Sequence, residues 1–314
     1  MLSKAEFRGG LLAVSAILIV VLLVVSLSPG LPGELLLQTL RFHLLAAGLG
    51  LAVLAILFGA RWRGLIVLLI VLASGAHGAL FVREFYERRT PVAEAPAAQF
   101  RFLSFNVLNG NRQAAQLVDA VIADPPDVML VMETPGIETH LDRLAQVLPY
   151  RLGCAVTTTC DISLLSRFPI EDGEIRRPPP YHFERLAIGR IVVDGQPITI
   201  AGIHLSKPYF DQSSWIELHS IGRILSAVEG PMVVAGDFNS AFWTEPMANL
   251  GAQLDLAPGP WPAATWPVRL GPLGVPIDNV FTSGNARLLT LEAGENYGSN
   301  HRPLWADVAI YPGS

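Results

Sequence analysis

The sequence predicts a layered α/β or α+β domain preceded by three transmembrane helices. Apolar residues make up 51% of the chain and charged residues only 16%, which is more apolar than an average soluble protein. The excess lies before residue 83, in three long runs. From residue 99 onward, short apolar runs rich in β-formers alternate with segments of helical periodicity, the pattern of packed strands and helices.

The N-terminal part, residues 1–89, is predicted to be a membrane anchor. Its apolar runs predict transmembrane helices at about residues 9–28, 38–60 and 64–82, each near the roughly 20 residues that cross a bilayer as a helix. The first run resembles a secretory signal in its basic N-terminal flank. It is long for a signal, however, and no small-x-small cleavage site follows it. We therefore interpret it as a retained helix of a multi-pass anchor.

Basic residues in the short loops predict the orientation of the anchor. Lys4 and Arg8 precede the first helix, and Arg61 and Arg63 lie between the second and the third. Because basic loops tend to stay on the cytoplasmic side, we expect the C-terminal domain to be extracytoplasmic, on the outer side of the inner or plasma membrane. The lipid bilayer is the partner that this arrangement implies, and the sequence indicates no protein partner.

Residues 90–98 are predicted to be a Pro/Ala linker, and residues 99–314 one domain of ordinary size. Residues 1–97 contain eight of the 22 basic and five of the 27 acidic residues, which leaves 14 basic and 22 acidic residues for the rest of the chain. This excess of acidic residues disfavours binding of long nucleic-acid duplexes. Cys154 and Cys160 could form a disulfide in an oxidising compartment or remain two free thiols.

Each element of the domain has its own signal in the sequence. A strand is expected over residues 100–107, because β-formers dominate there, and a helix over 113–123, where apolar residues recur on one side. The other expected elements are a buried strand at 127–132, a helical segment at 137–148, a hairpin of 190–193 and 198–203 around Asp194-Gly195, a helix at 215–228, and strands at 231–235, 275–281 and 304–310.

Polar residues stand at the ends of the predicted buried strands. They are Asn106, Glu133, His204, Asp237, Asn239, Asp278, Asn300 and His301. A single His or Asp at such a position usually has a structural role, for example in a turn. A whole series of metal-ligating and acid–base residues is harder to explain by turns, and it indicates a catalytic site.

Seven short motifs follow one another along residues 99–314. They are Ser104-Phe-Asn-Val107, Val131-Met-Glu133, Leu165-Ser-Arg-Phe-Pro169, Gly202-Ile-His-Leu205, Gly236-Asp-Phe-Asn-Ser240, Ile277-Asp278 and Ser299-Asn-His301. In this order they resemble the endonuclease/exonuclease/phosphatase superfamily, in a membrane-anchored form of bacterial type. The resemblance implies an α/β (α+β) four-layer sandwich, with two packed mixed β-sheets flanked by helices. It also implies hydrolysis of phosphate esters with a divalent cation, Mg²⁺ or Mn²⁺.

The resemblance assigns catalytic roles to five residues. Asp237 would activate the attacking water, and Asn239 would orient Asp237 or the phosphate. His301 would contact the phosphate or transfer a proton, and Asp278 would hold its ring in one tautomer. His204 would donate a hydrogen bond to the phosphate from the side opposite His301.

The resemblance assigns the metal to three further residues. Glu133 would be the principal ligand, with Asn106 beside it, since a hard cation prefers oxygen donors. Asn300 departs from the family pattern, because the usual Ser-Asp-His triplet is here Ser299-Asn300-His301. The Asn keeps an oxygen donor but loses the charge, so we expect weaker metal binding, a different metal preference or weakened activity.

The sequence therefore predicts a membrane-tethered, divalent-metal-dependent hydrolase of phosphate esters. The anchor and the acidic domain favour a phospholipid, a lipid pyrophosphate or another envelope phosphoester over nucleic acid. One alternative is an extracytoplasmic endonuclease or exonuclease, which a cleft lined by Arg176, Arg177, Arg185 and Arg190 would support. The other is a catalytically weakened membrane-bound binding protein. The Trp- and Pro-rich loop at 261–276 could contact a base, the lipid interface or a headgroup, or simply pack on the domain.

Overall fold

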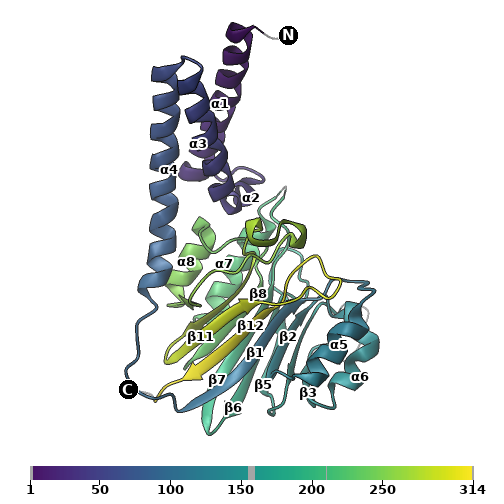
Figure 1. Ribbon diagram of the computed structural model, residues 1–314. Coiled ribbons are helices and arrows are strands. Elements are labelled where there is room, and N and C mark those ends of the chain that lie inside the picture. The colour runs from purple at the N-terminus through teal and green to yellow at the C-terminus, as the bar shows by residue number, and fades with distance from the viewer. Residues whose placement is uncertain (1–2, 155–159, 210, 313–314) are drawn as a thin grey trace.

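Two β-sheets pack face to face over the C-terminal part of the protein, as the computed structural model in Figure 1 shows. The structure describes residues 3–154, 160–209 and 211–312. The first sheet has the order β11–β12–β1–β2–β4–β3, with bounds Ala286–Ala293, Leu304–Ile310, Ala98–Asn106, Val128–Met132, Ile162–Ser166 and Tyr150–Leu152. The second has the order β5–β6–β7–β8–β10–β9, with bounds Glu171–Arg176, Leu186–Val193, Gln196–His204, Met232–Asp237, Asp278–Ser283 and Ala257–Pro258.

Both sheets are mixed. Strands β1 and β2 are parallel, as are β7 and β8, whereas the other pairs are antiparallel. The strands predicted at 100–107, 127–132, 231–235 and 304–310 correspond to β1, β2, β8 and β12. The predicted hairpin is also present, as β6 and β7. Its turn places Asp194 at φ 49° and Gly195 at φ 80°, and two positive φ values in sequence match the twist of a tight hairpin.

Helices cover the outer face of each sheet. On the first sheet lie α5 (Ala114–Ala123), the 3₁₀ helix η1 (Thr134–His140) and α6 (Leu141–Leu144), and on the second lie α7 (Ser213–Leu225) and α8 (Glu245–Gln253). Between the sheets, the inward side chains form a separate apolar core that includes Phe102, Leu130 and Ile200. Strands such as β2 and β8 are therefore buried on both faces. These are the layers that the resemblance implied.

The N-terminal part forms four helices, α1 (Lys4–Leu27), α2 (Glu34–Thr39), α3 (Arg41–Leu57) and α4 (Arg61–Glu87). Within the described residues, α1 and α4 are long and apolar enough to cross a membrane, and α3 is a shorter apolar helix. Of the three helices expected to span the membrane, two therefore meet the length of a span and α3 falls short of it. The 17 residues of α3 rise only about 26 Å, short of a bilayer core of about 30 Å. The predicted span 38–60 loses both ends, because Gln38 and Thr39 belong to α2 and Gly59, at φ 90°, lies beyond the helix end.

Helix α2 packs against the loop that follows β8. The Thr39 hydroxyl accepts a hydrogen bond from the Ala241 backbone N–H at 3.2 Å, and the Trp243 indole N–H donates to the carbonyls of Gln38 and Thr39 at 3.2 Å. The motif loop after Gly236-Asp237-Phe238-Asn239 is therefore held directly by the N-terminal part.

The C-terminal end of α4 packs against the second sheet and α8. Phe85 is fully buried there, and its ring stacks on Phe281 with centroids 5.4 Å apart. Helix α8 can come this close because Gly251 faces Phe85, where a Cβ atom would lie only 2.5 Å from the ring. Since α2 and α4 both contact the sandwich, the helices stand at one end of it with α2 at the junction (Figure 1).

Candidate active site

The polar residues predicted at strand ends converge because of the strand register. Asp237 at the end of β8 lies opposite Asp278 at the start of β10, and also beside His204 at the end of β7. In the other sheet, Asn106 ends β1 beside Met132, the residue before Glu133. Two parallel pairs and one antiparallel pair thus bring side chains from five strands to one edge of the sandwich.

The backbone of the Gly-Asp-Phe-Asn motif fixes the orientation of Asp237. Gly236 has φ +135°, and a Cβ atom there would lie 1.9 Å from the Ile203 carbonyl oxygen, so a side chain would push β7 and β8 apart. Asn239, at φ 48°, donates its backbone N–H to Asp237 Oδ1 at 2.8 Å. Its side-chain amide donates to the Leu205 carbonyl at 2.8 Å. Asn239 therefore lies in direct contact with Asp237, through its backbone N–H.

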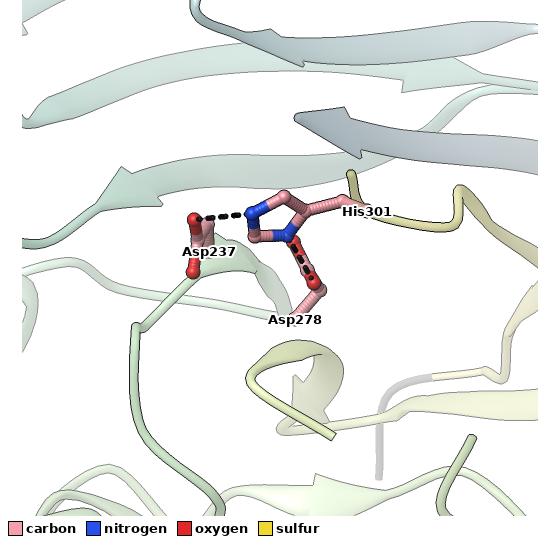
Figure 2. A group of neighbouring side chains, drawn as sticks. All are labelled: Asp237, Asp278 and His301. Atoms are coloured by element: carbon pink, nitrogen blue, oxygen red, sulfur yellow. Dashed lines mark hydrogen bonds and ion pairs between the residues drawn. The ribbon is translucent and has the colours of Figure 1, made fainter. Parts of the chain in front are cut away.

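His301 lies between two carboxylates (Figure 2). Its Nδ1 is 2.8 Å from Asp278 Oδ2, and its Nε2 is 3.8 Å from Asp237 Oδ2. Burial by itself would lower the pKa of His301, but the Asp278 and Asp237 carboxylates outweigh burial and raise that pKa to about 9. The ring is therefore held as a cation at neutral pH, with Nε2–H directed towards Asp237.

His204 has a matching arrangement on the other side of Asp237. Its Nδ1 lies 2.7 Å from Asp161 Oδ2 and its Nε2 lies 3.8 Å from Asp237 Oδ2. Burial opposes the charged ring, but the Asp161 carboxylate outweighs it and raises the pKa of His204. Sequence reasoning missed Asp161, because a lone Asp 43 positions before His204 carries no signal of this contact.

The two cysteines, left open from the sequence, form a disulfide. Cys154 is bonded to Cys160. Asp161 directly follows Cys160 and lies in the cleft beside His204. The disulfide thus anchors the chain immediately before the residue that orients His204.

Asp161 is expected to act through His204. Replacement of Asp161 by Asn should lower kcat/KM by about 100-fold, at the low end of what a positioned acid–base group contributes. The loss should grow as pH rises, since removal of the carboxylate lowers the pKa of His204 and so reduces the fraction of charged ring that can donate to the phosphate. The exposed Asp142→Asn variant on α6 is the matched control. A uniform loss of activity at every pH would assign Asp161 a merely structural role.

Asn106 and Glu133, from the first sheet, lie beside Asp237 and bring further side-chain oxygens to the site. Asn106 donates its side-chain amide to Asp237 Oδ2 at 3.0 Å and to Glu133 Oε1 at 3.2 Å. Glu133 stands at φ 56°, and its Oε2 accepts the Asn109 backbone N–H at 2.6 Å. Burial and the Asp278 carboxylate raise the pKa of Asp237, although both His rings oppose this. A divalent cation beside these carboxylates would favour their ionised forms.

The site fits a divalent cation by its donor set. Ligand atoms of Asp237, Asp278 and His301 all lie within 4.8 Å of one another. One oxygen of Asp278 also has no hydrogen-bond partner among the described residues. Because His301 Nδ1 is already engaged by Asp278, the oxygen-rich side with Glu133 and Asn106 suits a hard cation better.

Asn300 lies apart from this hydrogen-bond network. Its side chain is exposed, and its backbone carbonyl accepts the Val268 N–H at 3.4 Å. It lines a small pocket together with Asn239 and His301. The structure thus places seven of the eight predicted site residues in one network and Asn300 at its rim.

A cleft of about 480 Å³ adjoins Glu133 and His204. Arg185 and the exposed Lys207 line it, together with Tyr181. Of the four arginines considered for a nuclease, Arg185 alone lines this cleft. The other three are exposed and paired with carboxylates: Arg176 with Glu174, Arg177 with Glu184, and Arg190 with Glu171 and Asp172. A continuous basic strip for a nucleic-acid backbone is therefore not formed by these residues.

The sequence profile of the endonuclease/exonuclease/phosphatase family matches residues 103–301, which contain all of these site residues. The chain belongs to this family. It is accordingly a metal-dependent phosphoesterase, as the sequence motifs predicted. No significant match is found among curated proteins.

Solved structures share the fold at low sequence identity. A humanized TDP2 of D. rerio has 16% identity and a TM-score of 0.59 over 68% of this chain and 99% of its own. Sphingomyelinase C of Streptomyces griseocarneus has 16% identity and a TM-score of 0.51 over 67% of this chain and 99% of its own. A beta toxin of Staphylococcus aureus with bound magnesium ions has 13% identity and a TM-score of 0.51 over 68% of this chain and all (100%) of its own.

Proposed function

We propose that the protein is a membrane-tethered phosphoesterase that hydrolyses a phospholipid, a lipid pyrophosphate or another phosphoester of the cell envelope. The observation that carries this proposal is the contact between α2 and the catalytic motif. Thr39 binds the backbone of Ala241, two residues after Asn239, at 3.2 Å. Helix α2 directly follows α1, which is long and apolar enough to cross a membrane. The site would therefore lie next to the surface of the bilayer.

The residues of the site support hydrolysis by an activated water molecule. Asn106 and the backbone of Asn239 hold the two oxygens of Asp237, so that this carboxylate can take the proton from the attacking water. His301, protonated because of Asp278 and Asp237, can donate a hydrogen bond or a proton to the leaving oxygen. A divalent cation, Mg²⁺ or Mn²⁺, held by Glu133 and Asn106 would neutralise charge on the phosphoryl group. His204 would donate to the phosphate from the other side of Asp237.

The positions of the basic residues and the disulfide favour an extracytoplasmic site. Helix α1 begins, and α3 and α4 meet, at the end of the helices away from the sandwich (Figure 1). Lys4, Arg8, Arg61 and Arg63 belong to that end. With that end in the cytoplasm, α1 and α4 would each carry the chain outward, the shorter α3 would return it between them, and the sandwich would lie outside. The disulfide Cys154–Cys160 is consistent with an oxidising compartment.

Two of the structural relatives bear on the substrate and the metal of this proposal. One is named a sphingomyelinase, and another was solved with bound magnesium ions. Their similarity to this chain establishes the fold alone, so they motivate the choice of test substrates. Nucleic acid is disfavoured as the substrate for two reasons. Three of the four arginines considered for a nuclease are paired with carboxylates, and the chain after residue 97 has an excess of acidic residues that repels phosphates.

A hydrolysis panel with the full-length protein in vesicles tests the proposal. The substrates are a lipid pyrophosphate, a two-chain phospholipid, soluble mono- and diesters, and single- and double-stranded DNA, each with Mg²⁺ or Mn²⁺. We expect turnover of a lipid-borne phosphoester that chelation abolishes. Faster turnover of DNA than of every lipid would replace the proposal with the nuclease alternative. Metal binding without hydrolysis of any substrate would favour the binding protein.

A further inference from the structure

We propose that α2 and the loop at 261–276 form a subsite for a single apolar chain attached to the scissile phosphate. This inference rests on the proposed function and narrows its substrate class. Helix α2, between α1 and α3, would then determine substrate specificity. The Trp- and Pro-rich loop at 261–276 would form the opposite wall of the same subsite.

The subsite is a slot beside the catalytic residues. Its polar lining includes Asn239, Asn300 and His301 of the site, together with Thr39, Lys207 and Tyr209. Most of its apolar lining comes from two segments far apart in the sequence: Leu36 on α2 with Leu40 just after it, and Trp266, Val275 and Ile277 on the loop and at its end. A group whose phosphate contacts His301 therefore has an apolar path directly beside it, between the sandwich and α2.

The size of the slot limits what can enter. Its volume is about 70 Å³, less than half of a cavity of roughly 150 Å³ that holds one benzene ring. One linear chain can enter such a slot, whereas two acyl chains side by side cannot. The slot accommodates only the first carbons next to the phosphate. It therefore favours a phosphate joined directly to one linear chain, because in a two-chain phospholipid the second carbon from the phosphate oxygen already carries an acyl ester branch.

Exposed apolar side chains next to α3 extend the path towards the bilayer. Leu270 and Leu273 of the 3₁₀ helix η2 (Val268–Leu273) are 47% and 71% exposed. The same turn is joined to α3, because the Leu273 carbonyl lies 2.7 Å from His43 Nε2. Exposed leucines beside an apolar helix indicate contact with lipid, so the rest of the chain would continue into the bilayer on this side.

Lys207 places the charged part of the substrate. It is exposed and lines both the slot and the larger cleft next to Glu133 and His204. A phosphate bound where the slot meets the cleft would face this ammonium group. Its apolar chain would then lie in the slot, and its remaining oxygens or a second phosphate would lie in the cleft. The arrangement accommodates a monophosphate or a diphosphate on one chain.

The test compares one substrate of each kind with the full-length protein. The probes are farnesyl diphosphate, two-chain phosphatidic acid and a soluble aryl phosphate ester. Leu36→Phe narrows the slot and should lower the ratio of kcat/KM for farnesyl diphosphate over the aryl ester by at least about tenfold, the effect of a methylene-scale mismatch in an apolar pocket. Leu37→Phe, on the same helix but outside the lining of the slot, is the matched control and should leave this ratio unchanged. Trp266→Ala widens the slot and should raise turnover of phosphatidic acid relative to farnesyl diphosphate.

The outcomes separate the subsite from the function. Wild-type hydrolysis of the aryl ester, with the ratio equally affected or unaffected by Leu36→Phe and Leu37→Phe, would overturn the subsite and leave the phosphoesterase intact. A wild-type preference for phosphatidic acid would overturn the single-chain assignment. Absence of hydrolysis of every probe with Mg²⁺ and Mn²⁺ would overturn the proposed function, and the subsite with it. If Leu36→Phe fails to fold, the opposite shift expected for Trp266→Ala decides.

Discussion

Replacement of Asp237 by Asn is expected to lower kcat by about 1,000-fold or more, because it removes a positioned base. Asp237 is 1% exposed, and the other carboxylates described in the site are engaged elsewhere: Asp278 by His301, Asp161 by His204 and Glu133 by Asn109. The Asn side chain has the same shape and can accept one of the two hydrogen bonds that Asp237 receives, from Asn106 or from the Asn239 backbone, because only one of its two terminal atoms is an acceptor. The loss should therefore lie mainly in turnover, with a decrease in stability no larger than that of one hydrogen bond, about 1 kcal/mol.

The measurement is kcat on the best substrate of the panel, at several concentrations of Mg²⁺ and Mn²⁺. Thermal unfolding of the Asp237→Asn variant should stay close to that of wild type. Asp142→Asn, an exposed carboxylate on α6, should retain full activity. If Asp237→Asn keeps more than a tenth of wild-type turnover at saturating metal, Asp237 is not the base.

The convergence of the site residues was predictable from the sequence because buried strands have few reasons to end in polar residues. Asn106, His204 and Asp237 are the last residues of β1, β7 and β8, and the strand register then brings them to one edge. What each residue contacts was not predictable. Asn239 contacts Asp237 through its backbone N–H. This contact occurs where Asn239 has a φ of 48°, a conformation that the amino-acid sequence does not specify.

The N-terminal part shows where hydropathy alone is insufficient. The span expected at 38–60 begins within α2, because an apolar side chain has the same hydropathy whether it contacts lipid or protein. In the structure, Gln38 and Thr39 form hydrogen bonds with Trp243 and Ala241 of the sandwich. These contacts connect residues about 200 positions apart, and they separate α2 from α3. Asp161 was missed for the same reason, since its role depends on a tertiary contact with His204.

Strands near the sheet edges were also missed. Most of the residues of β5 and β11 are exposed or half-buried, so their apolar alternation is weak. The 3₁₀ helix η1 and the four-residue α6 replace the single helix expected over 137–148. The apolar spacing there identified the buried face correctly, because Ile137, Leu141 and Leu144 all pack on the first sheet.

The activity is expected to fall as pH rises through about 9, the pKa of His301. The direction of this pH dependence follows from the groups around His301. Burial alone favours the neutral ring, whereas the Asp278 and Asp237 carboxylates favour the charged ring and raise the pKa above its ordinary value of 6.5. The cation is therefore present below pH 9 and is lost above it. Since the charged ring is the form that can donate to the leaving oxygen, kcat/KM should decline on the basic side.

The Asp278→Asn variant tests which carboxylate sets this pKa. Removal of the carboxylate 2.8 Å from Nδ1 should lower the pKa of His301 and move the basic limb down by about one to three pH units, the usual effect of one adjacent charge. The variant should thus lose most activity at pH 8 and least at pH 6. In His301→Gln, which lacks an ionisable ring, the limb near pH 9 should disappear along with most of the activity. A basic limb that stays at the same pH in Asp278→Asn would assign it to another group, and Asp278 would then serve only to hold the ring in place.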